Sequence, residues 1–252
     1  MKIEILAESN EFLVIDKPYG LVVNRAESIS GKTVQDWIEE QGWFADWLKA
    51  SKVAKRTELS ELFLKRSGLC HRIDKETSGC LLIAKNEVTL DYFLRLFKER
   101  KVEKEYTALV HGLVEPKFGE VVLPMRRSIL NREKWQVHYD GKKAISSWQV
   151  EAYFKFPSDN ERWKDSLSLL HIGLKTGRTH QIRVHFSFLG WPLFADDRYL
   201  QRQQAVVDRA YLKRHFLHSS LISFVDETGK KWEIKSDLPE ECFDLLQSLE
   251  SR

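Results

Sequence analysis

The feature that most constrains the fold is a dense apolar run, Cys80-Leu81-Leu82-Ile83-Ala84, which begins directly after Gly79. A short apolar run bounded by glycine is typical of a buried strand. The polar segment His71–Ser78 leads into this strand. Side chains on a loop that enters a rigid core element are held in place, which is how a scaffold positions a reacting group. The sequence therefore predicts a positioned polar loop at the start of a buried strand.

One carboxylate in this loop, Asp74, lies between two cations, Arg72 and Lys75. Nearby cations are expected to lower the pKa of an aspartate and keep it ionised. An ionised and positioned aspartate can be a nucleophile, a base or an electrostatic stabiliser. A structural ion pair between Asp74 and Arg72 is the alternative, and this segment alone leaves both interpretations open.

Length and composition set the broad class. The 252 residues suffice for one large domain or two small ones, and 42% hydrophobic and 31% charged residues are typical of a soluble globular protein. No apolar run has the length of a membrane span, and Met1–Ile5 lacks the apolar core of a signal peptide. Three cysteines without CxxC spacing indicate neither a disulfide framework nor a zinc site. We expect a cytoplasmic protein.

A basic segment with aromatic residues lies between Met125 and Lys143, although the net charge of +3 is too small to indicate a nucleic-acid partner. Basic residues beside flat rings suit a phosphate backbone and its unstacked bases. A solvated hairpin of mixed surface is the simpler interpretation. The segment contains Arg126, Arg127, Arg132, Lys134, Lys142 and Lys143, with Trp135, His138 and Tyr139 among them.

Hydrophobic periodicity and turn residues predict a mixed α+β chain whose largely antiparallel central sheet is flanked by helices. We expect a single domain over residues 1–252, with an inserted, partly helical excursion at about 42–67. Strands are predicted at 12–15, 21–23, 79–85, 105–110, 119–123, 144–154, 167–174, 217–225 and 231–235. Helices are predicted after Thr33, from Asn86 to Lys101, from Thr179 to Gly190, and from about Pro239.

The predicted helix at 179–190 also shows the alternation of a strand. Its boundary residues favour a helix, because Thr179 can cap the start, Gly190 suits the position past the end, and Pro192 prevents continuation.

A second polar cluster, Lys175–His185, would form a turn into the N-terminus of this helix, where an anion or phosphate can bind. Arg183 lies one turn inside the helix and is expected to point in a fixed direction. Such clusters also occur where they only satisfy local backbone groups. A metal site is disfavoured, because His180 and His185 are five residues apart and do not share a helix face.

These segments together resemble the RluA family of RNA pseudouridine synthases. His71–Gly79 is similar to the family's HRLDxxTSG signature, and Ile15–Leu21 is similar to its first motif. Glu103–Ala108 resembles its KxYxA segment, and Gly177–His185 resembles its last motif. The four motifs follow in the family's order across most of the chain. The resemblance implies the pseudouridine synthase fold and the isomerisation of specific uridines in structured RNA, either rRNA or tRNA, without a metal or cofactor.

The resemblance also implies roles for single residues. Asp74 would be the catalytic carboxylate, Tyr106 would stack on the target base, and Arg183 would pair with the aspartate. Arg72 would help to displace the target nucleotide. Further contacts with RNA would come from Lys75, Arg178, Thr179, His180 and Gln181.

Two positions depart from the family pattern, namely Asn24, where histidine is usual, and Ala195, which replaces the glycine before Asp196. Neither is a catalytic position. Because the first motif begins within twenty residues of Met1, no S4-type RNA-binding domain is expected, and we expect a monomer.

Two other classes of function compete with this interpretation. The chain could be an RNA-binding module that kept the fold without catalysis, although the presence of Asp74, Tyr106 and Arg183 together weighs against that. It could also be another enzyme with an aspartate nucleophile, such as a glycoside hydrolase. Those enzymes need a second carboxylate as acid, and none stands out beside Asp74.

Overall fold

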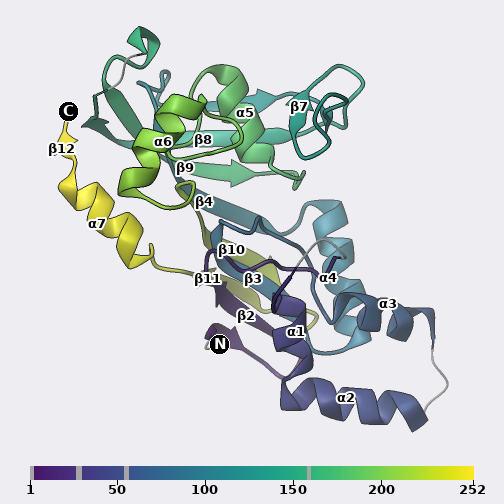
Figure 1. Cartoon of the computed structure of the whole chain (residues 1–252). Coiled ribbons are helices and arrows are strands. Elements are labelled where there is room, and N and C mark those ends of the chain that lie inside the picture. Colours follow the sequence, from purple (N-terminus) through teal and green to yellow (C-terminus); the bar gives the residue numbers. More distant parts are fainter. Residues whose placement is uncertain (1–2, 27–29, 54–56, 158–159) are drawn as a thin grey trace. The chain divides into compact units, whose positions relative to one another are not determined.

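The computed structural model describes residues 3–26, 30–53, 57–157 and 160–252, and the chain divides into two units (Figure 1). Unit 1 comprises Met1–Val102 and Leu221–Ser236. Unit 2 comprises Glu103–Ser220 and Asp237–Arg252. The single domain expected from the sequence therefore stays a prediction, and each unit is described by itself.

Unit 1 contains a mostly antiparallel sheet with helices to one side of its strands (Figure 1). Its strands follow the order β1-β2-β3-β10, and β11 also pairs with β10. The strands are β1 (Glu4–Glu8), β2 (Phe12–Lys17), β3 (Ser78–Ala84), β10 (Leu217–Val225, shared with unit 2) and β11 (Lys231–Lys235). The helices are α1 (Val34–Glu39), α2 (Gly42–Val53), α3 (Glu58–Arg66) and α4 (Glu87–Glu99).

The core of unit 1 confirms the buried strand that the apolar run predicts. All seven residues of β3 are buried, and the strand pairs with β2 from Phe12–Ala84 to Lys17–Gly79. Phe12 makes edge-to-face contacts with Phe93, Phe224 and Trp232, with ring centroids 5.1–5.7 Å apart. Contacts of this geometry contribute about 0.5–1.5 kcal/mol each beyond the burial of area.

Unit 2 contains an antiparallel sheet whose strands follow the order β4-β9-β8-β12, with β5 also paired to β8. A separate hairpin joins β6 to β7. The strands are β4 (Glu103–His111), β5 (Phe118–Val122), β6 (Met125–Arg127), β7 (Trp135–Val137), β8 (Ile145–Lys155), β9 (Ser166–Leu174) and β12 (Glu250–Ser251). The helices are α5 (Gln181–Leu189), α6 (Arg202–Tyr211), α7 (Glu240–Ser248) and the 3-10 turn η1 (Glu161–Trp163).

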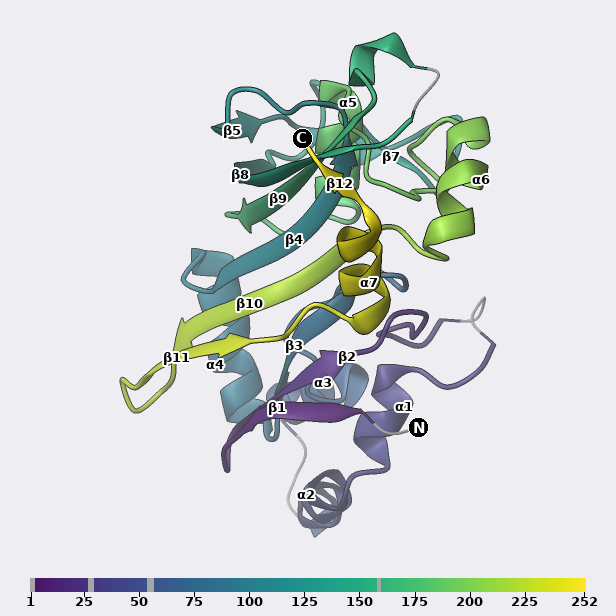
Figure 2. The ribbon, with the colours of Figure 1, turned by 90° about the vertical axis from the view of Figure 1, so that its left-hand side faces the viewer.

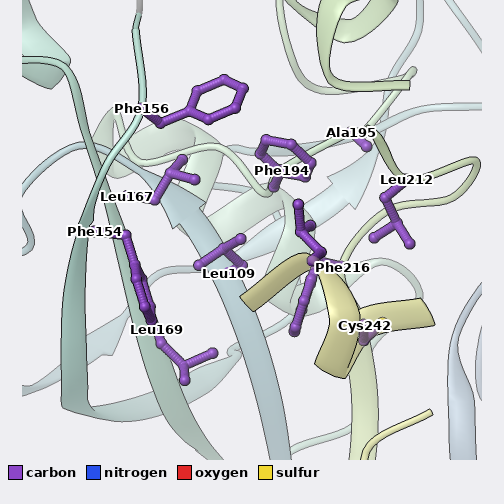
Figure 3. Close-up of a cluster of buried hydrophobic side chains, with 11 residues drawn as sticks. Leu109, Phe154, Phe156, Leu167, Leu169, Phe194, Ala195, Leu212, Phe216 and Cys242 are labelled. Carbon is purple, nitrogen blue, oxygen red and sulfur yellow. The ribbon is translucent and has the colours of Figure 1, made fainter. Parts of the chain in front are cut away.

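Helix α7 (Figure 2) covers a face of the unit 2 sheet through a buried apolar cluster, shown in Figure 3. Phenylalanine and leucine side chains from β4, β8 and β9 meet Cys242 and Leu245 of α7. The cluster consists of Leu109, Phe154, Phe156, Leu167, Leu169, Phe194, Ala195, Leu212, Phe216, Cys242 and Leu245.

Most predicted elements are confirmed. Segment 42–67, of which residues 54–56 lie outside the described residues, contains helices α2 and α3, and its being an inserted excursion stays a prediction. The strand predicted at 21–23 is wrong. The carbonyl oxygens of Val22 and Val23 instead accept hydrogen bonds from the backbone N–H groups of Val34 (2.9 Å) and Gln35 (3.1 Å). These carbonyls therefore satisfy the first N–H groups of α1, which have no partner inside the helix.

Two helices differ from expectation. Helix α5 begins at Gln181 with His180 as its N-cap, so the predicted capping by Thr179 is wrong, whereas Gly190 ends the helix with a left-handed φ of 87° as predicted. Helix α6, the 3-10 turn η1 and strands β1, β6, β7 and β12 are additional elements. Within the described residues, no helix combines the length and apolar composition needed to cross a membrane.

Candidate functional site

The loop that carries Asp74, here called the Asp74 loop (residues 70–77), leads into β3 in unit 1. The Asp74 carbonyl oxygen accepts a hydrogen bond from the Thr77 N–H at 3.1 Å, which closes a turn. Asp74 is half-buried, while Thr77 and the following strand are buried. The loop therefore has one end fixed in the core, as the sequence predicts.

A buried lysine holds the other side of this turn. Lys17 is fully buried at the end of β2, where it pairs with Gly79. Its Nζ donates to the carbonyl oxygens of Pro18 (2.7 Å), Leu21 (3.0 Å) and Lys75 (3.2 Å). An ammonium group has three donors, and these three acceptors match that number.

The Lys75 carbonyl oxygen also accepts a hydrogen bond from the Gly20 N–H at 2.8 Å. Gly20 has a φ of 80°, which glycine adopts without strain. The Pro18–Leu21 turn and the Asp74 loop are thus joined through one carbonyl and one buried ammonium. Sequence reasoning identified both motifs but missed Lys17 as the group that connects them.

The histidine of the loop, His71, is held by contacts inside the protein. The His71 Nε2 accepts a hydrogen bond from the Leu82 N–H at 3.0 Å, and its ring packs on Phe97 at 4.9 Å. His71 therefore fixes the loop against β3 and α4.

Arg72 and Lys75, the two cations beside Asp74, are exposed. Within the ranges that the structure describes, the Arg72 side chain has no hydrogen-bond or ion-pair partner, so the alternative of a structural Arg72–Asp74 ion pair is not formed there. Both side chains point a positive charge at solvent, where an anionic ligand can meet it.

In unit 2, Tyr106 lies on β4 opposite Ile172 of β9 and is buried. Two residues earlier on the same face of the strand lies Lys104. Burial lowers the pKa of Lys104 to about 8. A methyl group added to Gly177 would lie 3.8 Å from the Lys104 Nζ, so this amine adjoins the turn before α5.

Arg183 forms a buried, bidentate ion pair with Asp196. Its Nε and Nη2 donate to the two carboxylate oxygens, both at 2.8 Å. Burial alone would raise the pKa of Asp196, but hydrogen bonds and charge from Arg183 outweigh it and the pKa is lowered. The Arg183 guanidinium also lies over the Tyr199 ring at 5.1 Å. The prediction of a fixed direction for Arg183 is confirmed.

The turn before α5 is held by Gln181, which is buried. Its Oε1 accepts from the Thr176 hydroxyl (2.8 Å) and the Arg178 N–H (3.0 Å), and its Nε2 donates to the Ile145 carbonyl oxygen and the Ser146 Oγ, both at 3.0 Å. The amide of Gln181 therefore holds the turn before α5, and its predicted contact with RNA stays a prediction.

The other predicted RNA contacts of this turn are accessible to different degrees. Arg178 is exposed, and Thr179 and His180 are half-buried. His180 has a left-handed φ of 56°, and its Nδ1 lies 2.8 Å from the Tyr199 hydroxyl. Arg178, with its charge at the surface, is the best placed of the three to meet a phosphate.

Sequence reasoning missed a clamp on the loop that carries Asp196. The preceding residue, Ala195, has a left-handed φ of 59°. Its N–H donates to the Asp208 carboxylate at 2.9 Å, and its carbonyl oxygen accepts from the Arg209 Nε at 3.1 Å. Two successive residues of α6 therefore hold both polar backbone atoms of Ala195. No sequence motif marked α6.

Asp208 is itself held by a fully buried histidine. The His111 Nε2 lies 2.7 Å from the Asp208 Oδ2, and both side chains have no exposed area. The His111 ring stacks on Trp163 at 4.4 Å. This pair connects β4 to α6. Because Asp208 also accepts a hydrogen bond from Ala195, the pair supports the loop that carries Asp196, the partner of Arg183.

In the parts of the chain that the structure describes, histidine, cysteine and acidic residues form no group of three or more that could hold a metal ion. His185, which is not expected to bind a metal together with His180, is buried. Its Nδ1 lies 3.0 Å from the Ser146 Oγ, and burial lowers its pKa.

The predicted catalytic residues come from both units. Asp74 belongs to unit 1, and Tyr106 and Arg183 belong to unit 2. The pairing of Arg183 with Asp74 that the resemblance implies therefore stays a prediction.

Comparisons with known proteins agree on one family. A family model described as RNA pseudouridylate synthase matches residues 11–188. A Bacillus subtilis protein named uncharacterized RNA pseudouridine synthase YlyB is 33% identical over 251 residues, which are 99% of this chain and 73% of the relative. Ribosomal large subunit pseudouridine synthase D of Blochmanniella floridana is 37% identical over 197 residues, which are 78% of this chain and 54% of the relative. Several relatives are thus considerably longer than the region they share with this chain.

The fold has a solved counterpart. The structure of human RNA pseudouridylate synthase domain containing 1 superimposes with a TM-score of 0.70 at 23% identity, covering 100% of this chain and 89% of that one. At this identity the likeness concerns the fold.

Proposed function

Because the chain belongs to the RNA pseudouridylate synthase family, we propose that it converts specific uridines of structured RNA to pseudouridine with Asp74 as the catalytic carboxylate. The observation that carries the proposal is the Asp74 loop. Its aspartate stands in the family signature, on a turn that leads into buried strand β3 and whose Lys75 carbonyl oxygen accepts hydrogen bonds from the buried Lys17 Nζ and the Gly20 N–H.

The reaction is an isomerisation. The bond between uracil N1 and ribose C1′ breaks, the base turns, and C5 bonds to C1′, while C5 loses a proton and N1 gains one. No electron acceptor is required. The protein has to supply a carboxylate beside the sugar, a surface for the freed base, and a means to take the nucleotide out of its stack.

We assign the carboxylate to Asp74, the surface for the base to Tyr106, and displacement of the nucleotide to exposed Arg72. Arg183 would hold Asp74 ionised and oriented, as its fixed direction allows. Lys75, Arg178, Thr179 and His180 would contact RNA nearby. This assignment requires residues of both units to act on the same uridine.

The substrate we favour is ribosomal RNA. Relatives from Blochmanniella floridana and Salmonella typhi are named ribosomal large subunit pseudouridine synthases D and C. Transfer RNA is the second candidate, and the protein is expected to act as a cytoplasmic monomer.

The proposal is tested by mass spectrometry of pseudouridine, after carbodiimide labelling, in total RNA from cells with and without the gene. Wild-type protein should restore pseudouridine at defined rRNA positions, and Asp74→Asn should not. The asparagine keeps the volume of the side chain. Restoration by Asp74→Asn would contradict the catalytic assignment. The absence of any lost position would favour the RNA-binding module without catalysis.

The role of Tyr106 is tested by two substitutions. Tyr106→Phe keeps a ring for stacking and should retain part of the activity, whereas Tyr106→Ala should lose it. Equal losses would contradict stacking and indicate that the hydroxyl acts instead. Release of free uracil by the wild type would indicate a glycoside hydrolase.

A further inference from the structure

Helix α6, which the family motifs do not include, lines a groove of about 500 Å³ in unit 2. We propose that this groove binds backbone phosphate of the RNA substrate away from the target nucleotide. The inference rests on the proposed function and adds to it a second place where the RNA is held. The lining side chains that matter are Arg202, Arg209 and Lys213, with Ala205, Val206 and Asp197.

The spacing of these residues places them on one face of the helix. Positions 202, 205, 206 and 209 follow the i, i+3, i+4, i+7 pattern, and Lys213 continues the stripe just past the end of α6. The basic residues of this stripe are Arg202 at one end, Lys213 at the other end and Arg209 between them. Because α6 ends at Tyr211, the cations are presented by a short and rigid element.

The charges of the groove favour an anion. Three cations face one carboxylate, that of Asp197. Arg202 and Lys213 are exposed, and neither side chain has a hydrogen-bond or ion-pair partner within the residues described. Two cations without an acidic partner, one at each end of a concave surface, are a site for a polyanion.

Arg209 gives the groove a fixed wall. Its guanidinium donates to the carbonyl oxygens of Ala195 and Lys213, both at 3.1 Å, and its Nη2 lies 3.6 Å from the Asp197 Oδ1. A planar guanidinium held at several points loses little conformational entropy when a phosphate binds. Arg202 and Lys213 can then close on the same ligand from either side.

The floor of the groove suits the sugar part of a nucleic-acid backbone. It consists of small apolar residues, Ala205, Val206 and Ala210, of which Val206 is 67% exposed. An exposed apolar patch between cations can contact ribose carbons while the cations contact the phosphates. This combination favours an RNA backbone over an inorganic anion.

The groove is joined to the Arg183 cluster through the clamped residue. Arg209, the wall of the groove, holds the Ala195 carbonyl oxygen, and the next residue, Asp196, holds Arg183. RNA bound along α6 would therefore be anchored on the same loop that fixes Arg183. We expect the groove to contribute to binding of RNA and not to the rate of the chemical step.

The experiment compares Arg202→Ala/Lys213→Ala with wild type in binding and in turnover. The control is Lys98→Ala/Lys231→Ala, which removes the same charge from two exposed positions of unit 1. Filter binding to structured rRNA transcripts at several salt concentrations gives Kd and its salt dependence. Pseudouridine formation on the same transcripts gives kcat and KM.

The groove variant should raise Kd and KM at least about tenfold at low salt and leave kcat unchanged. The slope of log K against log salt should fall by about 1.4 to 1.8, as expected for two lost phosphate contacts. Equal weakening in the control variant would overturn the proposal, because the effect would then be one of total charge. An unchanged Kd in the groove variant would also overturn it.

Binding and turnover separate this inference from the proposed function. If the wild type binds RNA but forms no pseudouridine, the proposed activity has failed, and the filter-binding comparison still decides whether the groove binds RNA.

Discussion

In unit 1 the loop of Asp74 is held by its backbone, whereas in unit 2 Arg183 is held by its side chain. Buried Lys17 and the Gly20 N–H bind the carbonyl oxygen of Lys75, the residue after Asp74. Arg183 is instead fixed by two hydrogen bonds to Asp196, and Asp196 lies on a loop that α6 clamps at Ala195.

The difference predicts how each region tolerates substitution. Where main-chain atoms hold a loop, the side chain at its tip can change without loss of the fold. Where a buried ion pair holds a side chain, removal of one partner leaves an uncompensated charge in the core. Chemistry at Asp74 should therefore be separable from stability, while chemistry at Arg183 should not.

The largest effect on stability is expected at Asp196. Asp196→Asn removes the carboxylate charge that two 2.8 Å hydrogen bonds join to buried Arg183, and it should lower the free energy of unfolding by about 3–5 kcal/mol, measured by urea denaturation. The matched control is Asp197→Asn, because Asp197 is half-exposed and 3.9 Å from Arg183. If Asp196→Asn were as stable as Asp197→Asn, the interpretation that a buried ion pair holds Arg183 in place would be contradicted.

The next effect is expected at Lys17. Lys17→Met keeps the length of the side chain and removes three hydrogen bonds to carbonyl groups, so it should cost roughly 2–3 kcal/mol and reduce kcat by loosening the Asp74 loop. For stability, Lys75→Met is the control, because Lys75 is exposed and should change the free energy by less than about 0.5 kcal/mol. Equal kcat in Lys17→Met and wild type would show that Lys17 does not position the loop.

The contrast between the two regions also explains what the sequence could predict. The buried strand β3, the cap Asn86 of α4 and the hairpin β10–β11 follow from local patterns, and the structure confirms them. Asp74 stands beside such a pattern, so the positioned loop could be predicted. The family could be predicted because four of its motifs occur in the expected order along the chain.

The remainder depends on contacts between distant parts of the chain. Lys17 is 58 residues from Lys75, and His111 is 97 residues from Asp208, so no local spacing reveals either contact. Helix α6 begins at Arg202, and its N-cap Gln201 makes no side-chain cap hydrogen bond, which is why no boundary signal marked the helix. The four hydrogen bonds of the Gln181 amide likewise reach residues as far as 36 positions away, so the sequence did not reveal that this side chain holds the turn.

A smaller effect is expected from Lys104. Its pKa is about 8 in the folded protein and 10.5 in an unfolded chain, so between these pH values the folded state binds fewer protons. Wild-type stability should therefore rise with pH across this window relative to Lys104→Met, by roughly 1–2 kcal/mol after allowance for partial exposure. The difference in unfolding free energy between the two proteins, followed from pH 7.5 to 10.5, tests this; parallel curves would contradict a desolvated amine.

The smallest effect is expected at Ala195. Glycine would remove the strain of the left-handed φ, which should stabilise the protein by about 1–2 kcal/mol. Two effects oppose this gain, namely the loss of one buried methyl group (~0.8 kcal/mol) and the greater backbone entropy of the unfolded chain (~0.4–1 kcal/mol). Ala195→Gly should thus change stability by less than about 1 kcal/mol in either direction, whereas Ala195→Val should lower the melting temperature clearly. Similar melting temperatures for Ala195→Val and wild type would contradict the clamp that α6 places on this residue.

The most direct test of the central claim is the single-turnover rate of pseudouridine formation by wild type and Asp74→Asn on one rRNA transcript. Release of tritium from C5 of labelled uridine reports the rate, and the same preparations give Kd for RNA and the free energy of unfolding. We predict that Asp74→Asn loses product formation by about three orders of magnitude or more, with Kd within about threefold and stability within about 1 kcal/mol of wild type. A residual rate near that of wild type, or a loss explained by unfolding, would contradict the assignment of chemistry to Asp74 and of its position to the backbone of the loop.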